Sequence, residues 1–201
     1  MSLEKILFID RDGTIIEEPA DEQIDSFAKL RFLPGAISNL RKIVETLDYE
    51  LVMITNQDGL GTDSFPEDTF WPVQNFIVQT LRDEGIEFRE ICIDKTFPHE
   101  NAPTRKPETG LLTHYIQGDF DLGNSFVFGD RTSDVQLAKN LGSRAIFIGE
   151  AVVEGAELST LSWDAIYAYL SGLPRRVTVE RKTKETSIEI ELDGDGTGNA
   201  S

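Results

Sequence analysis

The sequence predicts an α/β protein built on a central parallel sheet, and two observations support this prediction. Short apolar runs bounded by turn residues recur along the chain, and longer segments with a helical pattern separate them. Strand–helix alternation of this kind produces right-handed crossovers and therefore a parallel sheet. At 201 residues, the chain is long enough for one domain with a sizeable core. We therefore expect a three-layer α/β/α domain whose sheet has about five strands.

The individual elements follow from local patterns. Apolar runs that end at turn residues indicate buried strands, and they fall at 5–10, 50–55, 88–93, 125–129 and 144–148. Helical patterns cover 35–47, 67–84, 107–117 and 132–142. Pro34 and Gly35 open the first helix, and Pro66 opens the second, which has an acidic first turn. The polar segment between Gly13 and Pro34 has no long period, so we expect a small hairpin that forms a flap.

The pattern changes after Pro174. Segments 175–181 and 188–192 alternate apolar and polar residues, as half-buried strands do, and a turn-rich stretch follows them. We interpret residues 1–172 as one domain, and 173–201 as a linker and the truncated start of another, partly disordered. The alternative is an edge hairpin added to the first domain.

Composition narrows the range of partners. The net charge is −17, and no basic run precedes Arg175. Nucleic-acid-binding proteins show basic patches, so we expect no nucleic-acid partner. No apolar stretch approaches the ~20 residues that span a bilayer, and the N-terminus lacks a signal-peptide pattern. We therefore expect a cytosolic protein without membrane association. Cys92 is the only cysteine, which excludes an intrachain disulfide.

Two carboxylates follow the first predicted strand. Asp10 and Asp12 stand at spacing i and i+2, and Gly13 permits a tight bend directly after them. Such a pair suits divided labour, in which one carboxylate attacks and the other transfers a proton. The alternative is an ordinary solvated turn, since Asp and Gly are common turn residues.

Three further polar clusters support the catalytic interpretation. They are Thr55-Asn56-Gln57 at the end of the second strand, Arg105-Lys106-Pro107 at the start of a helix, and residues 129–134 at the end of the fourth strand. Ligands of open α/β sheets bind at these strand and helix ends. Together the clusters supply a hydroxyl, an amide, a cation and further carboxylates, which is the chemistry needed to handle a phosphate with a divalent metal.

In their order along the chain, these four segments resemble the four motifs of the haloacid dehalogenase-like phosphohydrolases. The resemblance covers about residues 4–170, and each motif alone is weak. Within the family, the motif sequences are most similar to those of the histidinol-phosphate phosphatase branch. These motifs lie at residues 8–14, 55–62, 105–107 and 129–134. The resemblance implies a Rossmann-like fold and a phosphomonoester hydrolase.

The resemblance also implies roles for the carboxylates. Asp10 would attack phosphorus and form an aspartyl-phosphate, and Asp12 would act as general acid and base. Mg²⁺ would be held by Asp10, the backbone carbonyl of Asp12, and Asp130. Asp134 would be a further or alternative ligand, although it could equally cap the helix that begins at Thr132.

The remaining expected site residues fall into two groups. The phosphoryl group would be contacted by Thr55, Asn56, Lys106 and Arg11. The rest of the substrate would be contacted by Glu17, Glu18, Gln23 and Gln57. Histidinol phosphate carries an amine and an imidazole, and acidic flap residues suit both. The alternative for the glutamates is a solvated turn, because charged residues are mostly exposed.

Relatives of this branch often carry a cysteine-rich zinc loop before Arg-Lys-Pro. Here residues 94–104 contain His99 but no cysteine, and one histidine cannot build a tetrahedral zinc site. We therefore expect Mg²⁺ and no structural zinc. The end of the chain resembles the start of an imidazoleglycerol-phosphate dehydratase, which implies a covalently fused dehydratase domain in a bifunctional enzyme.

The most favoured function is therefore hydrolysis of the phosphate ester L-histidinol phosphate in histidine biosynthesis. Heptose-bisphosphate phosphatase is the nearest alternative, because it resembles the same motifs. Polynucleotide 3′-phosphatase is disfavoured by the acidic charge. A non-catalytic regulatory module fused to the dehydratase is a fourth hypothesis, which the intact aspartates and lysine disfavour.

Overall fold

The structure is a computed structural model that describes residues 3–173, 176–182 and 187–193. Six parallel strands form its main sheet, in the order β3-β2-β1-β4-β5-β6. Their bounds are β1 Ile6–Ile9, β2 Glu50–Asn56, β3 Glu90–Asp94, β4 Phe126–Gly129, β5 Arg144–Phe147 and β6 Leu158–Ser159. The chain builds outward from β1 to β3 and then returns to the other side of β1 with β4. The strand order therefore reverses between β1 and β4, and open α/β sheets bind ligands at such a point.

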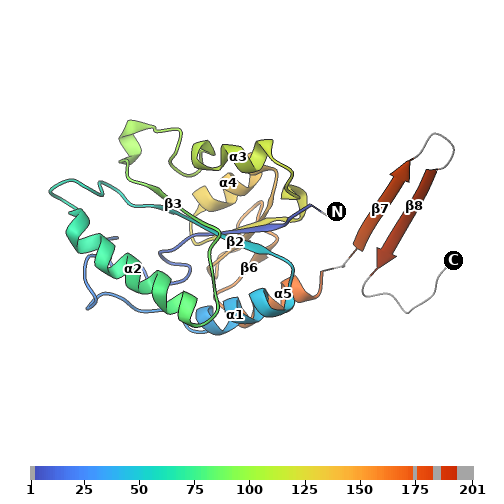
Figure 1. Cartoon of the computed structure of the whole chain (residues 1–201). Helices are drawn as coiled ribbons and strands as arrows, with labels where there is room; N and C mark the ends of the chain where they lie inside the picture. The colour runs from blue at the N-terminus through green and yellow to red at the C-terminus, as the bar shows by residue number, and fades with distance from the viewer. Residues whose placement is uncertain (1–2, 174–175, 183–186, 194–201) are drawn as a thin grey trace.

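Helices cover both faces of this sheet (Figure 1). They are α1 Ala36–Thr46, α2 Glu67–Asp83, α3 Thr113–Gln117, α4 Thr132–Leu141 and α5 Trp163–Ser171. Short 3₁₀ turns lie at η1 Pro98–Glu100, η2 Gly110–Leu112 and η3 Leu122–Asn124. Because side chains alternate along a strand, Leu7 and Ile9 of β1 pack with α1, α2 and α5, while Ile6 and Phe8 pack with α3 and α4. The three-layer α/β/α prediction is confirmed.

The structure differs from the predicted elements in three places. The helix expected at 107–117 begins only at Gly110, because the preceding backbone forms turns: Glu108 N–H donates to the Arg105 carbonyl, and Gly110 N–H donates to that of Pro103. The sheet has a sixth strand, β6, which is too short to show a pattern. Helix α5 was not predicted, although Ser162 caps it by accepting from the Ala165 N–H.

The expected flap, between Gly13 and Pro34, has its two ends joined by backbone pairing but forms no long strands. Ile16 and Phe32 make one antiparallel bridge, and Leu33 N–H donates to the Ile15 carbonyl at 2.9 Å. Ile15, Ile16 and Ile24 are buried and anchor the segment to the core. The flap is therefore a folded loop with a hairpin-like base.

Strands β7 Arg176–Lys182 and β8 Ser187–Asp193 pair with each other antiparallel, in a sheet separate from the six-stranded one. We expected residues 173–201 to be partly disordered, and residues 174–175, 183–186 and 194–201 of this range lie outside the described residues. The domain boundary near residue 172 stays a proposal.

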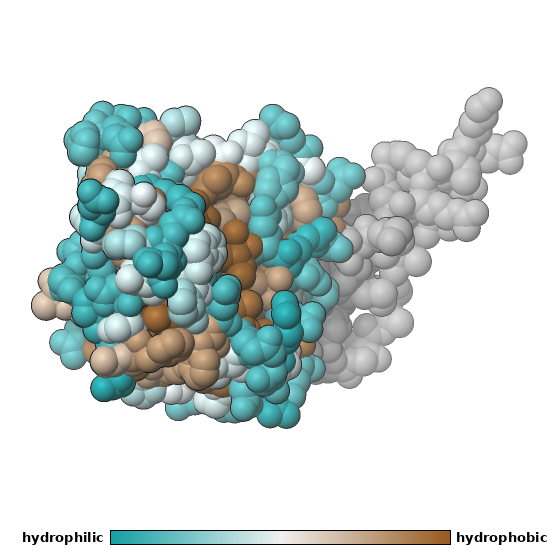
Figure 2. Space-filling model, turned by 60° about the vertical axis from the view of Figure 1, so that its left-hand side comes forward, coloured by the Kyte–Doolittle hydropathy of each residue, from teal (hydrophilic) through white to brown (hydrophobic). Residues whose placement is uncertain are grey.

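The visible surface is mostly hydrophilic (Figure 2). On the face seen in Figure 2, hydrophilic side chains predominate and hydrophobic ones form smaller areas between them. No helix among the described residues is long and apolar enough to cross a membrane.

Candidate active site

A cavity of about 310 Å³ opens at the carboxyl ends of β1 and β2. Seven of the residues that the sequence singled out line it, namely Asp10, Asp12, Glu18, Gln23, Thr55, Asn56 and Lys106. The short buried strand β1 ends at Ile9, and the Asp10 N–H donates to the Phe128 carbonyl of β4 at 2.9 Å. The sheet thus delivers Asp10 to the floor of the cavity at the point where the strand order reverses.

Lys106 lies between two buried carboxylates. Its Nζ is 2.8 Å from Oδ1 of Asp10 and 2.7 Å from Oδ1 of Asp134. Burial alone would lower the pKa of Lys106, but these two carboxylates raise it above its ordinary value. Burial raises the pKa of Asp10, which Lys106 opposes and Asp134 reinforces. The lysine therefore stabilises the ionised form of Asp10, the form that a nucleophile needs.

Asp10, Asp130 and Asp134 form a cluster in which one oxygen of each carboxylate lies within 4.8 Å of the others. Burial, and then the charges of Asp10 and Asp134, raise the pKa of Asp130 to about 7. Its buried Oδ1 has no hydrogen-bond partner. With Lys106, three ionised carboxylates leave two negative charges unbalanced. This set of hard oxygen donors fits one divalent cation such as Mg²⁺.

Two glycines allow the cluster to close. Gly13 has φ +69°, and a Cβ there would lie 2.0 Å from Oδ2 of Asp130. A Cβ at Gly129 would lie 2.1 Å from Cγ of Asp134. Only glycine lets the backbone approach these carboxylates so closely, so both motif glycines have a geometric reason at the site.

The carboxylate of Asp12 accepts hydrogen bonds from two residues that do not line the cavity. Arg11 donates from Nε to Oδ1 and from Nη2 to Oδ2 of Asp12, both at 2.9 Å. Gln57 Nε2 donates to the same Oδ2 at 2.6 Å. Arg11 and Gln57 are buried, and neither lines the cavity. We expected them to contact phosphate and substrate, but the structure places their polar groups behind Asp12.

Thr55 and Asn56 are the last two residues of β2 and line the cavity beside Lys106. Thr55 Oγ1 accepts a hydrogen bond from Gln57 Nε2 at 2.9 Å, so its own proton remains available to a ligand. Asn56 receives the Lys106 N–H on Oδ1 at 3.1 Å and donates to the Lys106 carbonyl at 3.3 Å. The amide of Asn56 thus holds the backbone that carries the lysine.

The flap contributes acidic residues to one wall. Glu18 lines the cavity and pairs with Arg131 at 2.6 Å, and Glu22 lies 3.5 Å from the same guanidinium. Burial raises the pKa of Glu18, although Arg131 opposes this. Gln23 also lines the wall, whereas Glu17 is exposed and does not. Arg131 was missed by the sequence analysis, although it lies inside the 129–134 motif.

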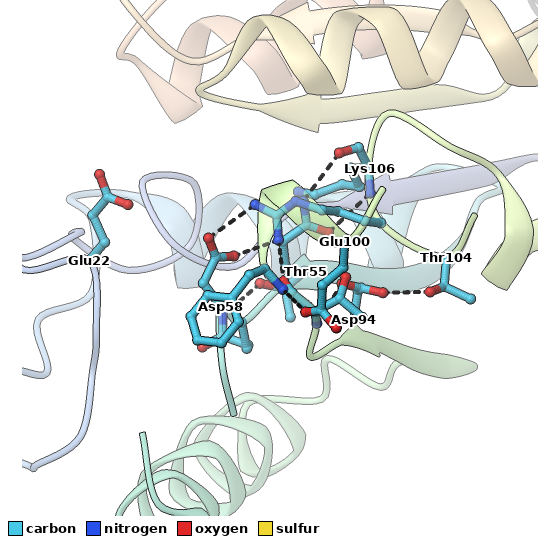
Figure 3. A network of polar contacts seen from close by, with 12 residues as sticks. Glu22, Thr55, Asp58, Asp94, Glu100, Thr104 and Lys106 are labelled. Atoms are coloured by element: carbon cyan, nitrogen blue, oxygen red, sulfur yellow. Dashed lines mark hydrogen bonds and ion pairs between the residues drawn. The ribbon is translucent and has the colours of Figure 1, made fainter. Parts of the chain in front are cut away.

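The loop between β3 and Lys106 forms the opposite wall and is tied by hydrogen bonds. Buried Asp94 accepts from Thr96 Oγ1 and from Thr104 Oγ1, both at 2.6 Å, and so joins both ends of the loop. Arg105 makes a two-point ion pair with Asp58, at 2.6 and 3.1 Å. Figure 3 shows this network, with Glu22 standing apart from it on the flap. The sequence did not identify the pair of Arg105 and Asp58, because these residues lie 47 positions apart in the chain.

Comparisons with known proteins agree with this geometry. The family described as "HAD-hyrolase-like" matches residues 103–173. The histidine biosynthesis bifunctional protein HisB of Spirosoma linguale is 52% identical over 98% of this chain and 56% of its own length. The HisB protein of Bacteroides fragilis is 51% identical over 96% of this chain and 54% of its own. The chain therefore spans about half the length of these curated relatives.

Among solved structures, D,D-heptose 1,7-bisphosphate phosphatase from B. bronchiseptica, complexed with magnesium and phosphate, has a TM-score of 0.72. It is 22% identical and covers 83% of this chain and 98% of its own. This likeness shows the fold, and the bifunctional proteins show a much closer sequence relationship. Together with the four motifs gathered at one sheet edge, these matches confirm the resemblance to the haloacid dehalogenase-like hydrolases.

Proposed function

We propose that this chain is a Mg²⁺-dependent phosphatase that converts L-histidinol phosphate to L-histidinol and phosphate. One observation carries the proposal: a buried carboxylate paired with a lysine stands beside a three-carboxylate cluster, on the floor of an acidic cavity. The names of the relatives, which are histidine-biosynthesis proteins, support the substrate class. A non-catalytic module would have no need for this assembly of buried charge.

In the first step, an Asp10 oxygen attacks phosphorus and the bond to the substrate's alkoxide oxygen breaks. Asp12 gives its proton to the departing alkoxide, which leaves as the alcohol. Lys106 balances charge on Asp10 and on the transferring group. The free proton of Thr55 is placed to bond a phosphoryl oxygen, as a preorganised donor should be.

In the second step, the Asp12 carboxylate takes a proton from water, and the water oxygen attacks the aspartyl-phosphate. The bond between phosphorus and Asp10 breaks, which releases inorganic phosphate and restores both aspartates. Asp10, Asp130 and Asp134 would hold Mg²⁺. When bound, this ion supplies the positive charge that lets an anionic carboxylate approach an anionic phosphate.

The charges of the cavity favour a cationic substrate. Six carboxylates line it, those of Asp10, Asp12, Glu18, Asp21, Glu22 and Asp58. Three cations line it, those of Lys106, Arg105 and Arg131. Arg105 and Arg131 are already paired with carboxylates, so a second phosphate would find little free positive charge. This disfavours a heptose bisphosphate and suits the amine of histidinol phosphate.

The rest of the proposal concerns the whole protein. The D,D-heptose 1,7-bisphosphate phosphatase structure matches 83% of this chain, whereas the bifunctional relatives match 96–98%. The remainder therefore fits a linker and the start of a fused dehydratase domain, beginning near residue 173. A cytosolic location and the lack of a structural zinc remain parts of this proposal.

A phosphate-release assay with Mg²⁺ tests the substrate. The panel comprises L-histidinol phosphate, D-glycero-D-manno-heptose 1,7-bisphosphate, a 3′-phosphorylated oligonucleotide and 4-nitrophenyl phosphate. We expect the highest kcat/KM on L-histidinol phosphate. A higher value on the heptose bisphosphate would overturn the assignment within the family.

The flap supplies a matched pair of variants, Glu18→Gln and Glu17→Gln. Glu18 lines the cavity and Glu17 does not. A hydrogen bond to a charged group is worth ~1.5–3 kcal/mol, so Glu18→Gln should raise KM for L-histidinol phosphate roughly ten- to a hundredfold. Its effect on 4-nitrophenyl phosphate should be much smaller, and Glu17→Gln should change neither. Equal effects of Glu18→Gln on the two substrates would mean that the flap does not bind the amine of the substrate.

A further inference from the structure

Arg11 is the most unusual side chain of the site, because a full positive charge is completely buried next to the cavity without lining it. Its Nε and Nη2 grip both oxygens of Asp12. Its Nη1 donates to Gln74 Oε1 of α2 at 2.9 Å, and its guanidinium lies over the Phe70 ring at 5.0 Å. Four of its five N–H groups are thus engaged by protein, and the side chain is fully buried.

Gln57 closes this arrangement into a ring. Its Oε1 accepts from Arg11 Nη2 at 3.0 Å, and its Nε2 donates to Asp12 Oδ2 and to Thr55 Oγ1. One buried amide therefore connects the Asp12 carboxylate with the Thr55 hydroxyl. The rotamers of Asp12 and Thr55 are set together, by partners that the substrate cannot displace.

We propose that Arg11, braced by Gln57 and Gln74, is a positioning residue that fixes the Asp12 carboxylate for proton transfer to the leaving group; this rests on the proposed function. Arginine suits the task because its planar fork matches both carboxylate oxygens, which a lysine ammonium cannot do. Oδ2 of Asp12 accepts from both Arg11 and Gln57, whereas Oδ1 accepts only from Arg11 and keeps a lone pair for the leaving group or for water. Arg11 acts on the reaction only through Asp12.

The proposal predicts an effect that depends on the leaving group. An alkoxide such as that of histidinol needs a proton as it departs, whereas weakly basic 4-nitrophenolate leaves without one. General acid catalysis contributes ~10²–10⁴-fold, so Arg11→Lys should lower kcat/KM for L-histidinol phosphate by at least about a hundredfold. The loss in kcat/KM for 4-nitrophenyl phosphate should be under about tenfold, because only the orientation of Asp12 is disturbed. A purely structural role would lower both values equally.

Controls separate these outcomes. Arg144 also makes a two-point pair, with Glu157, and lies over an aromatic ring, that of Phe126, but it is remote from the cavity. Arg144→Lys should leave both kcat/KM values unchanged. In an Asp12→Asn background, Arg11→Lys should cause no further loss on 4-nitrophenyl phosphate, because the residue through which it acts is already disabled.

Melting temperatures of all variants are measured alongside. If Arg11→Lys does not fold, Gln74→Met carries the same test, because it removes a hydrogen bond that holds Arg11 without touching Thr55 or leaving a charge unpaired. Equal losses on the two substrates, or a further loss in the double variant, overturn the proposal. If the wild type hydrolyses 4-nitrophenyl phosphate but not L-histidinol phosphate, the substrate assignment fails, and glycerol phosphate replaces the alkyl substrate in the comparison. A wild type that is inactive on every phosphate overturns both.

Discussion

Replacing Lys106 by methionine should destabilise the metal-free protein strongly. The side chain is only 4% exposed and pairs with Asp10 and Asp134 at 2.8 and 2.7 Å. Methionine keeps much of the side-chain length but removes the charge, so two buried carboxylates lose their counter-ion. Breaking a buried ion pair in this way costs about 3–5 kcal/mol of the free energy of unfolding.

Two conditions should reduce that loss. Removing Lys106 takes away the main influence that opposes the raised pKa of Asp10, so this carboxyl would stay protonated to a higher pH. A group whose pKa is higher in the folded than in the unfolded protein stabilises the folded state at low pH. That stabilisation is lost as the pH rises through the folded-state pKa. The deficit should therefore be smaller at about pH 5 than at about pH 8. Added Mg²⁺ should also narrow it, because the ion binds the folded carboxylates and replaces the lost charge.

Urea denaturation with and without EDTA, at both pH values, measures these effects. The control is Lys95→Met, which removes another lysine from an ion pair, with Glu67 at 2.6 Å. Both partners of that pair are exposed to solvent, so its loss should matter far less. If Lys106→Met lowers the free energy of unfolding by less than about 1 kcal/mol at pH 8 in EDTA, the reasoning is refuted, because such a loss is typical of a solvent-exposed ion pair.

The remaining predictions concern the metal cluster, the glycine bend and the end of the chain. Because the pKa of Asp130 is raised to about 7, Mg²⁺ must displace a proton below that pH. Titration calorimetry should therefore show Mg²⁺ affinity rising with pH up to about 7. The stability of the metal-free protein should fall from about pH 4 to 7. A Mg²⁺ affinity that does not change with pH would exclude Asp130 as a ligand. Gly13→Ala should lose activity and stability, because its Cβ would lie 2.0 Å from Asp130. Gly85→Ala, with φ +78° and no atom within 4 Å of its Cβ, should lose only the backbone cost of about 1–2 kcal/mol, and equal losses would contradict the packing argument. Deleting residues 176–201 should leave melting temperature and phosphatase activity close to the full chain, whereas a drop of several degrees would show that this segment pairs with the phosphatase sheet.

The fold was predictable where strands are buried on both faces. Runs such as Ile6–Ile9 and Phe126–Gly129 read as continuous apolar segments because helices cover both sides of the sheet. The pattern could not reveal β6, since two residues carry no period. It also could not reveal that residues 107–109 form turns, because that depends on hydrogen bonds to Pro103 and Arg105.

For the site, sequence reasoning identified which clusters should meet but not which way each side chain points. Parallel strands bring their carboxyl ends to one edge, so Asp10, Thr55 and Asp130 could be placed near each other without a structure. The direction of Arg11 depends on Gln74, 63 residues away on α2. No spacing rule links these two positions, and Arg11 therefore looked like a phosphate ligand. The pairing of Glu18 with Arg131 was hidden for the same reason.

The central claim is that Asp10 carries the phosphoryl group during turnover. In the most direct test, the enzyme is mixed with L-histidinol phosphate and Mg²⁺, quenched rapidly in acid, digested and analysed by mass spectrometry. The account predicts a phosphoryl adduct on Asp10 that appears within the first turnover and decays as substrate is exhausted. Asp10→Asn should show no adduct and less than about a thousandth of the activity, on the scale of losses of catalytic groups. Substantial turnover by Asp10→Asn, or an adduct on another residue, would contradict the account.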